Sequence, residues 1–188
     1  KAQRILALGI TSGLQHAIFA MANLFIQSAV NTFSAAVVEG NSAAANADSL
    51  VYEVMAAPYT ACSTFISQNY GAHNKERIQK AYRVSLVYSF GVGAVLGLAL
   101  MFFGGGFLRI FTPDPEVIAA GMEKLHIMGW SYAFSAFMDN SLAASRGLGK
   151  SAVPVAIVIL GSCVFRVIWV YTIFAMFHTL TSLYLLYI

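Results

Sequence analysis

The sequence predicts an all-α, polytopic membrane protein on the basis of its composition and its apolar stretches. Hydrophobic residues make up 59% of the 188 residues and charged residues only 10%, and the mean hydropathy is +0.71. A soluble domain carries about 25% charged residues. Five apolar stretches are each long enough to cross a bilayer, which takes about 20 helical residues, and a sixth begins near the end. Because backbone polar groups in lipid must be bonded within the chain, we expect helices.

The apolar stretches are separated by short polar or glycine-rich segments. We predict a linker of small residues at 34–47, a kink at Pro58 and a break of the third stretch at 104–106. The last apolar run is only about half a bilayer long, so we expect the chain to be a piece of a larger protein. The predicted spans are residues 5–33, 48–69, 81–103, 117–145 and 151–177, and the sixth starts at Leu180.

Lysine and arginine gather on one side of the predicted spans. With the N-terminus inside, the inner segments hold eight of the eleven basic residues, including those of the loop 73–80 and the turn 146–150. Basic residues resist translocation, so we predict a multi-pass protein of the cytoplasmic membrane with these segments in the cytoplasm and Ser42 and Asp114 outside. The basic loop could instead bind anionic lipid. The short loops argue against a nucleic-acid partner.

Polar side chains recur along one face of three predicted spans. In lipid such groups usually face a cavity or bond to a neighbouring helix. For the hydroxyls we favour bonding to a neighbouring helix, and for the larger polar side chains a substrate or ion cavity. The cavity candidates are Asn23, Gln27, Asn31, Glu53, Thr60, Thr64, Tyr132, Ser135 and Asp139.

Three charged residues inside the spans carry more specific hypotheses. Glu53 and Arg166 lie at the same predicted depth, roughly 22–24 Å from the inner boundary. A lone charge there costs several kcal/mol, so we predict that they pair; alternatively Glu53 faces the cavity and Arg166 reaches outward. Asp139 lies nearer the inner end. We expect Asp139 either to contact the cavity there, or to cap the turn or pair with Arg146.

The sequence holds no pattern typical of catalysis or of metal binding. It lacks the His-Glu-x-x-His and Gly-x-Ser-x-Gly motifs and a glycine-rich phosphate loop. Cys62 and Cys163 fall inside predicted spans, where we expect buried free thiols. The prediction is therefore a protein that is not an enzyme, with no metal site and no cofactor.

Two polar segments resemble the signatures of one transporter family. Residues 67–77 contain a Gln-Asn-x-Gly-Ala-x-x-x-x-Arg pattern, and residues 146–151 contain an Arg-Gly-Leu-Gly pattern. In this order and spacing they resemble the cytoplasmic signatures of the second half of multidrug and toxic compound extrusion (MATE) transporters. The signature positions are Gln68, Asn69, Gly71, Arg77, Arg146, Gly147, Gly149 and Arg166.

The resemblance extends over the whole chain, through further similar segments at 26–33, 38–46, 111–117 and 166–169. It implies a twelve-helix exporter with two pseudo-symmetric six-helix bundles, of which this chain is the second with a truncated sixth helix. The implied partners are the lipid bilayer, the N-terminal half of the same transporter and small organic, often cationic substrates. Sodium or proton antiport would drive their export, without a cofactor.

The chain also departs from the family pattern. Some members carry an acid in the middle of the first helix of this bundle, where residues 19–23 hold none, and another in the fourth helix near Ser135, one turn before Asp139. The alternatives are a lipid-linked saccharide flippase of the same superfamily and a scaffold or enzyme subunit without transport. A flippase needs several cations in its cavity, whereas only Arg166 and Lys124 lie inside the spans.

Overall fold

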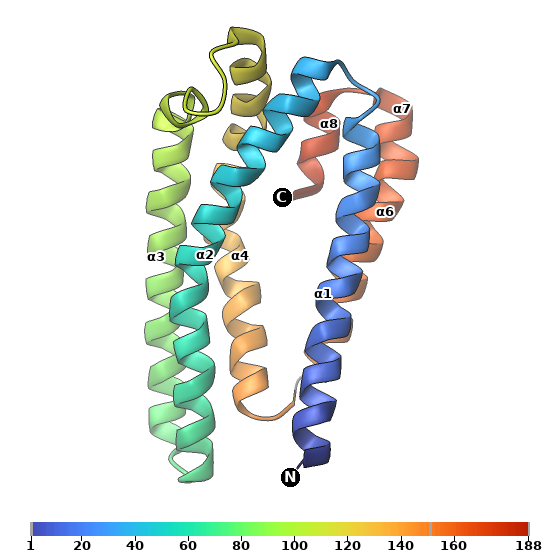
Figure 1. The fold of residues 1–188 in the computed structure, drawn as a ribbon. Helices are drawn as coiled ribbons and strands as arrows, with labels where there is room; N and C mark the ends of the chain where they lie inside the picture. The colour runs from blue at the N-terminus through green and yellow to red at the C-terminus, as the bar shows by residue number, and fades with distance from the viewer. Residues whose placement is uncertain (1, 151, 188) are drawn as a thin grey trace.

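The computed structural model describes residues 2–150 and 152–187, and these form helices and turns without a strand (Figure 1). Four long helices come first in the chain. Each is longer than the roughly 20 residues that cross the hydrocarbon layer. They are α1 (Ala2–Val30), α2 (Ala35–Gly71), α3 (Lys75–Leu108) and α4 (Pro115–Gly147).

A fifth helical rod follows, in which α-helix alternates with two π-helical segments. π-Helical segments are rare overall, and those that occur are frequently found at functional sites. A left-handed residue, His178, ends the rod, and a reciprocal capping box of Thr179 and Ser182 starts a short last helix at Leu180, where the sixth stretch is predicted. The rod consists of α5 (Ala152–Val158), η1 (Ile159–Val164), α6 (Phe165–Trp169), η2 (Val170–Phe174) and α7 (Ala175–Phe177), and α8 (Leu180–Tyr184) and η3 (Leu185–Tyr187) follow.

Two helices of the described residues are long and apolar enough to cross a membrane by length and composition. They are α3 and the rod, Ala152–Phe177. The other predicted spans lie largely within α1, α2 and α4.

Two predictions about helix ends are wrong. Residues 35–47 are not a linker but the first part of α2, because alanine favours helix and Ala44 and Ala47 are buried against α3 and α4. The glycines at 104–106 do not break α3, which continues to Leu108. Gly104 is buried instead, and a Cβ there would lie 2.9 Å from the Leu125 side chain, so this glycine allows close packing on α4.

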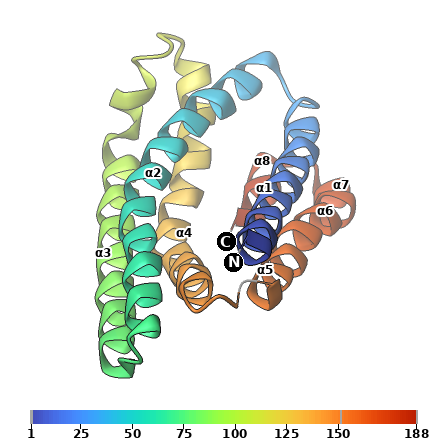
Figure 2. The same cartoon turned by 60° about the horizontal axis from the view of Figure 1, so that its bottom comes forward.

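The helices form two groups. Helices α2, α3 and α4 pack together, and α1 lies along the rod (Figures 1 and 2). The short helix α8 packs against both α4 and η2 and so contacts both groups. The α1–α2, α3–α4 and α7–α8 connections lie at one end of the bundle, here called the outer end. The α2–α3 and α4–α5 connections lie at the opposite, inner end, so the helices alternate in direction as predicted.

Candidate functional site

Near the outer end, one asparagine links four helices. The Asn41 side chain donates to Gln27 Oε1 at 3.2 Å, and its own Oδ1 accepts from the Tyr184 hydroxyl at 3.4 Å. The Lys124 ammonium donates to the Asn41 carbonyl oxygen at 3.4 Å, and Gln27 donates to Asn31 at 2.9 Å. We call these five residues the Asn41 network. It joins α1 to α2, α4 and α8 through polar contacts.

Closer to the middle of the bundle, an acid and a cation come from different helices. The Arg166 guanidinium lies 4.9 Å from the centre of the Tyr187 ring, and its Nη1 donates to Asn23 Oδ1 at 3.4 Å. Asp48 on α2 lies within electrostatic reach of Arg166 and Lys124. Lys124 is 4% exposed, and a cation so buried needs compensating charge. The attraction of Asp48 offsets part of that cost.

The predicted pair of Glu53 and Arg166 is not formed. Arg166 is engaged by Asn23 and by the Tyr187 ring, while Glu53 is exposed on α2. Helix α2 packs with α3 and α4, whereas the Arg166 segment packs along α1, and a depth predicted from the sequence does not fix which helices are neighbours.

At the inner end, Asp139 is buried and Arg146 is half-buried. Asp139 is 7% exposed; its Oδ1 accepts a long hydrogen bond of 3.5 Å from Tyr52, and its Oδ2 has no partner among the described residues. Arg146 Nη2 donates to Gln15 Oε1 at 2.6 Å, which joins α4 to α1. Arg146 also lies within electrostatic reach of Asp139. We call these four residues the inner polar group.

Two of the hydroxyl candidates bond to their own helices. Thr64 donates to the Thr60 carbonyl at 3.2 Å, and Ser135 donates to the Tyr132 carbonyl at 2.9 Å. Thr60 and Thr64 are exposed on α2. A hydroxyl satisfied in this way needs neither a cavity nor a partner helix, so these contacts support neither interpretation.

Two signature segments end helices at the inner end in the same way. Gly149 has a φ of +74°, and the amides of Gly149 and Lys150 return to carbonyls of the last turn of α4. His73 has a φ of 56° at the end of α2, with the Asn74 amide bonded to the Asn69 carbonyl at 2.9 Å. Both ends are Schellman motifs, in which a left-handed residue follows the helix.

The other signature positions differ in what they do. A Cβ at Gly147 would lie 2.7 Å from the Ser63 carbonyl oxygen, so this glycine lets α4 touch the backbone of α2. A Cβ at Gly71 would meet no atom within 4 Å. Gln68 is exposed and so is Arg77, whose amide is capped by the Asn74 side chain at 3.1 Å. Of the signature positions, Gly149 shapes an inner turn and Gly147 allows the close contact of α4 with α2.

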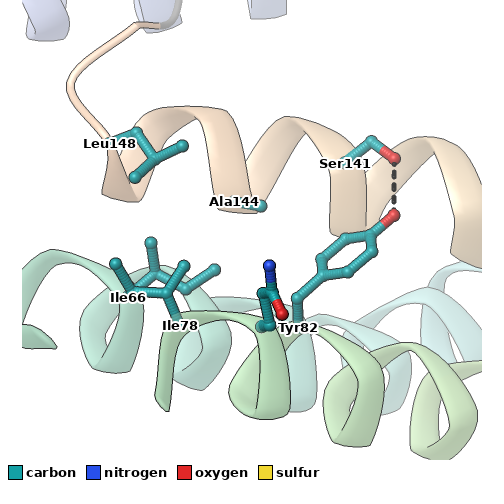
Figure 3. A pocket seen from close by; sticks show the side chains of 7 residues that line it. Ile66, Ile78, Tyr82, Ser141, Ala144 and Leu148 are labelled. Carbon is teal, nitrogen blue, oxygen red and sulfur yellow. Dashed lines mark hydrogen bonds between the residues drawn. The ribbon is translucent and has the colours of Figure 1, made fainter. Parts of the chain in front are cut away.

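A cavity of about 330 Å³ lies between α2, α3 and α4 next to these turns (Figure 3). Its walls are mostly apolar, with Ile66, Ile78 and Leu148 among them, and the Tyr82 hydroxyl lies 3.1 Å from Ser141 Oγ at one side. None of the sequence-predicted cavity residues lines it. Its position within one group of helices fits a packing gap better than a transport site.

Several residues of the polar clusters escaped the sequence analysis as site residues. Asn41 was assigned to a linker, and Asp48 and Lys124 were noticed only as charges within or near spans. One signal was available: Asn41 and Asp48 are seven residues apart, two helical turns, and share a face once α2 is known to begin at Ala35. Gln15 and Tyr184 had no comparable signal, because their partners come from distant segments.

Across residues 2–150 and 152–187, no group of three or more His, Cys, Asp or Glu side chains is arranged to hold a metal ion. Asp48 and Asp139 are single carboxylates on α2 and α4, each with a tyrosine and a cation nearby.

Comparison with known sequences settles the family. The model of the family described as MatE matches residues 12–172. This chain belongs to the MatE family.

Named relatives of the MatE chain are bacterial. The probable multidrug resistance protein YpnP of Bacillus subtilis is 28% identical over 145 residues, which are 76% of this chain and 33% of that protein. The probable multidrug resistance protein NorM of Thermotoga maritima is 24% identical over 155 residues, 82% of this chain and 33% of that protein. The chain thus spans about a third of the length of the curated relatives it matches.

Solved structures share the fold. A MOP superfamily transporter from Pyrococcus furiosus superposes with a TM-score of 0.84 at 17% identity, covering 98% of this chain and 41% of that one. An outward-facing multidrug resistance MATE family transporter of the MOP superfamily gives 0.83 at 16% identity, covering 98% and 40%. The chain therefore has the all-α bundle architecture found in these transporters.

Proposed function

We propose that this chain is the second helical bundle of a cation-coupled antiporter, in which sodium or proton entry drives the export of amphipathic or cationic compounds across the cytoplasmic membrane. The N-terminal half of the same transporter would be its partner. Membership of the MatE family and the multidrug resistance names of the relatives support this class of activity.

One observation of the structure supports the proposal further: Asp48 and Asp139 lie at different depths, Asp139 accepts a hydrogen bond from Tyr52, and each acid lies within electrostatic reach of a cation. Ionisable groups inside a membrane are costly and usually mark ion or substrate pathways. A carboxylate can bind the coupling ion in one conformational state and release it in another. If the ion and the exported compound compete for this carboxylate, ion entry is coupled to export. The unpartnered Oδ2 of Asp139 is free to accept such a cation or a proton.

The test is gradient-driven transport by the full-length protein in proteoliposomes. A cationic dye is loaded, and its efflux is measured under an imposed sodium or proton gradient for the wild type and for Asp48→Asn and Asp139→Asn. Glu39→Gln is the matched control, because Glu39 is an exposed acid at the outer end of α2. We expect coupling to be lost in at least one of the two test variants and kept in the control.

Three outcomes would count against the proposal in different ways. Wild-type vesicles that move no dye under either gradient would contradict the transport activity and favour the scaffold alternative. Movement of a lipid-linked saccharide without ion coupling would favour the flippase. Full coupling in both Asn variants would show that the ion site does not lie at these carboxylates of the bundle.

A further inference from the structure

A groove of about 420 Å³ lies between α2 and α3 at the inner end, apart from both polar clusters. Its volume is within the roughly 300–1,000 Å³ typical of small-molecule sites. One end of the groove is polar and is lined by Asn69, Arg77 and Lys80. Arg77 and Lys80 are exposed and three residues apart, so they lie on the same face of α3. This end therefore presents two cations to whatever enters.

The surrounding segment is basic as well. Residues 75–83 hold Lys75, Arg77, Lys80 and Arg83 against the single acid Glu76, which gives a local net charge of +3. Only two of these four basic residues line the groove. The other two are exposed beside it and provide a charge-matched comparison.

The other end of the groove is apolar and enters the membrane-spanning part of α3. Phe65, Val84 and Tyr88 line it and are 59%, 58% and 64% exposed. No charged residue follows Arg83 until the end of α3, so Val84 begins the apolar run. Arg77 and Tyr88 are eleven residues apart, about 16 Å along the helix. The groove thus starts among cations and continues beside apolar side chains, which matches the polarity of an amphiphile with an anionic head.

The floor of the groove is fixed by internal bonds. The Ser85 hydroxyl lies 2.9 Å from the Pro58 carbonyl oxygen and 2.5 Å from Asn140 Oδ1, and all three residues belong to the packed group of α2, α3 and α4. Ser85 and Pro58 also line the groove. Because its walls and floor lie in one packed group, the groove does not depend on contacts with α1 or the rod.

We propose that this groove binds one anionic phospholipid from the leaflet at the inner end. The phosphate lies at Arg77 and Lys80, and an acyl chain lies over Phe65, Val84 and Tyr88. Charge complementarity at one end and apolar exposure at the other select this occupant over a zwitterionic lipid. The inference rests on the chain spanning a bilayer, as the proposed function requires, but not on any transported compound.

The test is native mass spectrometry of the full-length protein titrated with phosphatidylglycerol or phosphatidylcholine. Each basic residue near a membrane surface adds to the binding free energy of an anionic lipid. We therefore expect the double variant Arg77→Gln with Lys80→Gln to weaken phosphatidylglycerol binding by about 30-fold. Lys75→Gln with Arg83→Gln removes the same charge outside the groove and is expected to have a much smaller effect. Equal losses in the two double variants, or equal binding of both lipids by the wild type, would overturn the proposal.

The apolar end has its own matched pair of variants. Val84→Trp fills the groove, whereas Val87→Trp adds the same bulk at an exposed position of α3 that does not line it. We expect only Val84→Trp to lower phosphatidylglycerol binding, and equal binding by both variants would contradict the site. Lipid binding is measured on purified protein, so a failure of the transport experiment leaves this result independent.

Discussion

Glycines bring α3 and α4 into close contact, and one added methyl group is enough to perturb it. A Cβ at Gly93 would lie 2.9 Å from the Tyr132 carbonyl oxygen, and a Cβ at Gly97 would overlap the Gly129 carbonyl oxygen. Since the opposing atoms belong to the backbone, they cannot rotate away. Gly97→Ala therefore requires α3 and α4 to separate.

The expected cost follows from the size of that clash. Overpacking a tight contact costs typically 1–3 kcal/mol, partly offset by the roughly 1 kcal/mol that alanine gains over glycine in a helix. Because the clash is with backbone atoms, the cost lies in the upper part of this range, and we expect Gly97→Ala to lower the free energy of unfolding by a net amount of about 1–2 kcal/mol. Each kcal/mol lowers the melting temperature by about 2–4 °C for 150–250 residues and by less in a longer chain, so we expect the melting temperature of the full-length protein to fall by at most about 8 °C.

The assay is thermal melting of the purified full-length protein, followed by the loss of its monodisperse elution peak. Gly91→Ala is the control on the same helix, because a Cβ at Gly91 meets no atom within 4 Å. We expect this control to melt at or slightly above the wild-type temperature. If Gly97→Ala melts as high as Gly91→Ala, the close approach of α3 and α4 is refuted.

Three further predictions concern the inner turns, the contact between helix groups and the topology. A residue with a side chain costs about 1–2 kcal/mol in the left-handed conformation that His73 and Gly149 adopt. We therefore expect His73→Gly to raise the melting temperature and Gly149→Ala to lower it. Shifts of the same sign in the two variants would contradict the two Schellman ends. Arg146→Gln removes a charge-assisted bond worth about 1.5–3 kcal/mol, so spin-label distances between α1 and α4 are expected to lengthen at the inner end, and an unchanged distribution argues against this contact. Impermeant thiol reagents are expected to label a cysteine at Ser42 but not at Lys75 in intact cells, and labelling at Lys75 would reverse the orientation.

Much of the helical architecture could be predicted because it follows from local signals. The start at Leu180 was predicted from the beginning of an apolar run, and the structure shows a capping box of neighbouring residues at the same place. The start of α2 could not be predicted, because a run of small residues suits both a linker and a tightly packed helix. Tertiary packing decides between them: a Cβ at Gly40 would lie 2.5 Å from the Val117 carbonyl oxygen, so this segment touches α4 along its backbone.

The candidate site was only partly predictable for a different reason. Helical periodicity identified Asp139 and Gln27, which the structure places in the inner polar group and the Asn41 network. Periodicity also selected Thr60 and Thr64, whose face is exposed, because it measures which side of a helix is polar and not what that side meets. The partners of Lys124 come from another helix, and no spacing within α4 encodes them.

The distribution of contacts indicates where the bundle can move. Within α2, α3 and α4, glycines bring backbones together, and separating them means losing close packing that water does not replace. Between α1 and this group, the described contacts include the side-chain hydrogen bonds of Gln27 at the outer end and Gln15 at the inner end. When the helices separate, water can replace the partners in such bonds, whereas it cannot replace the close packing of backbones. Alternate opening of the two ends, which the proposed antiport requires, is therefore expected to break these polar contacts in turn and to leave the glycine-packed group intact.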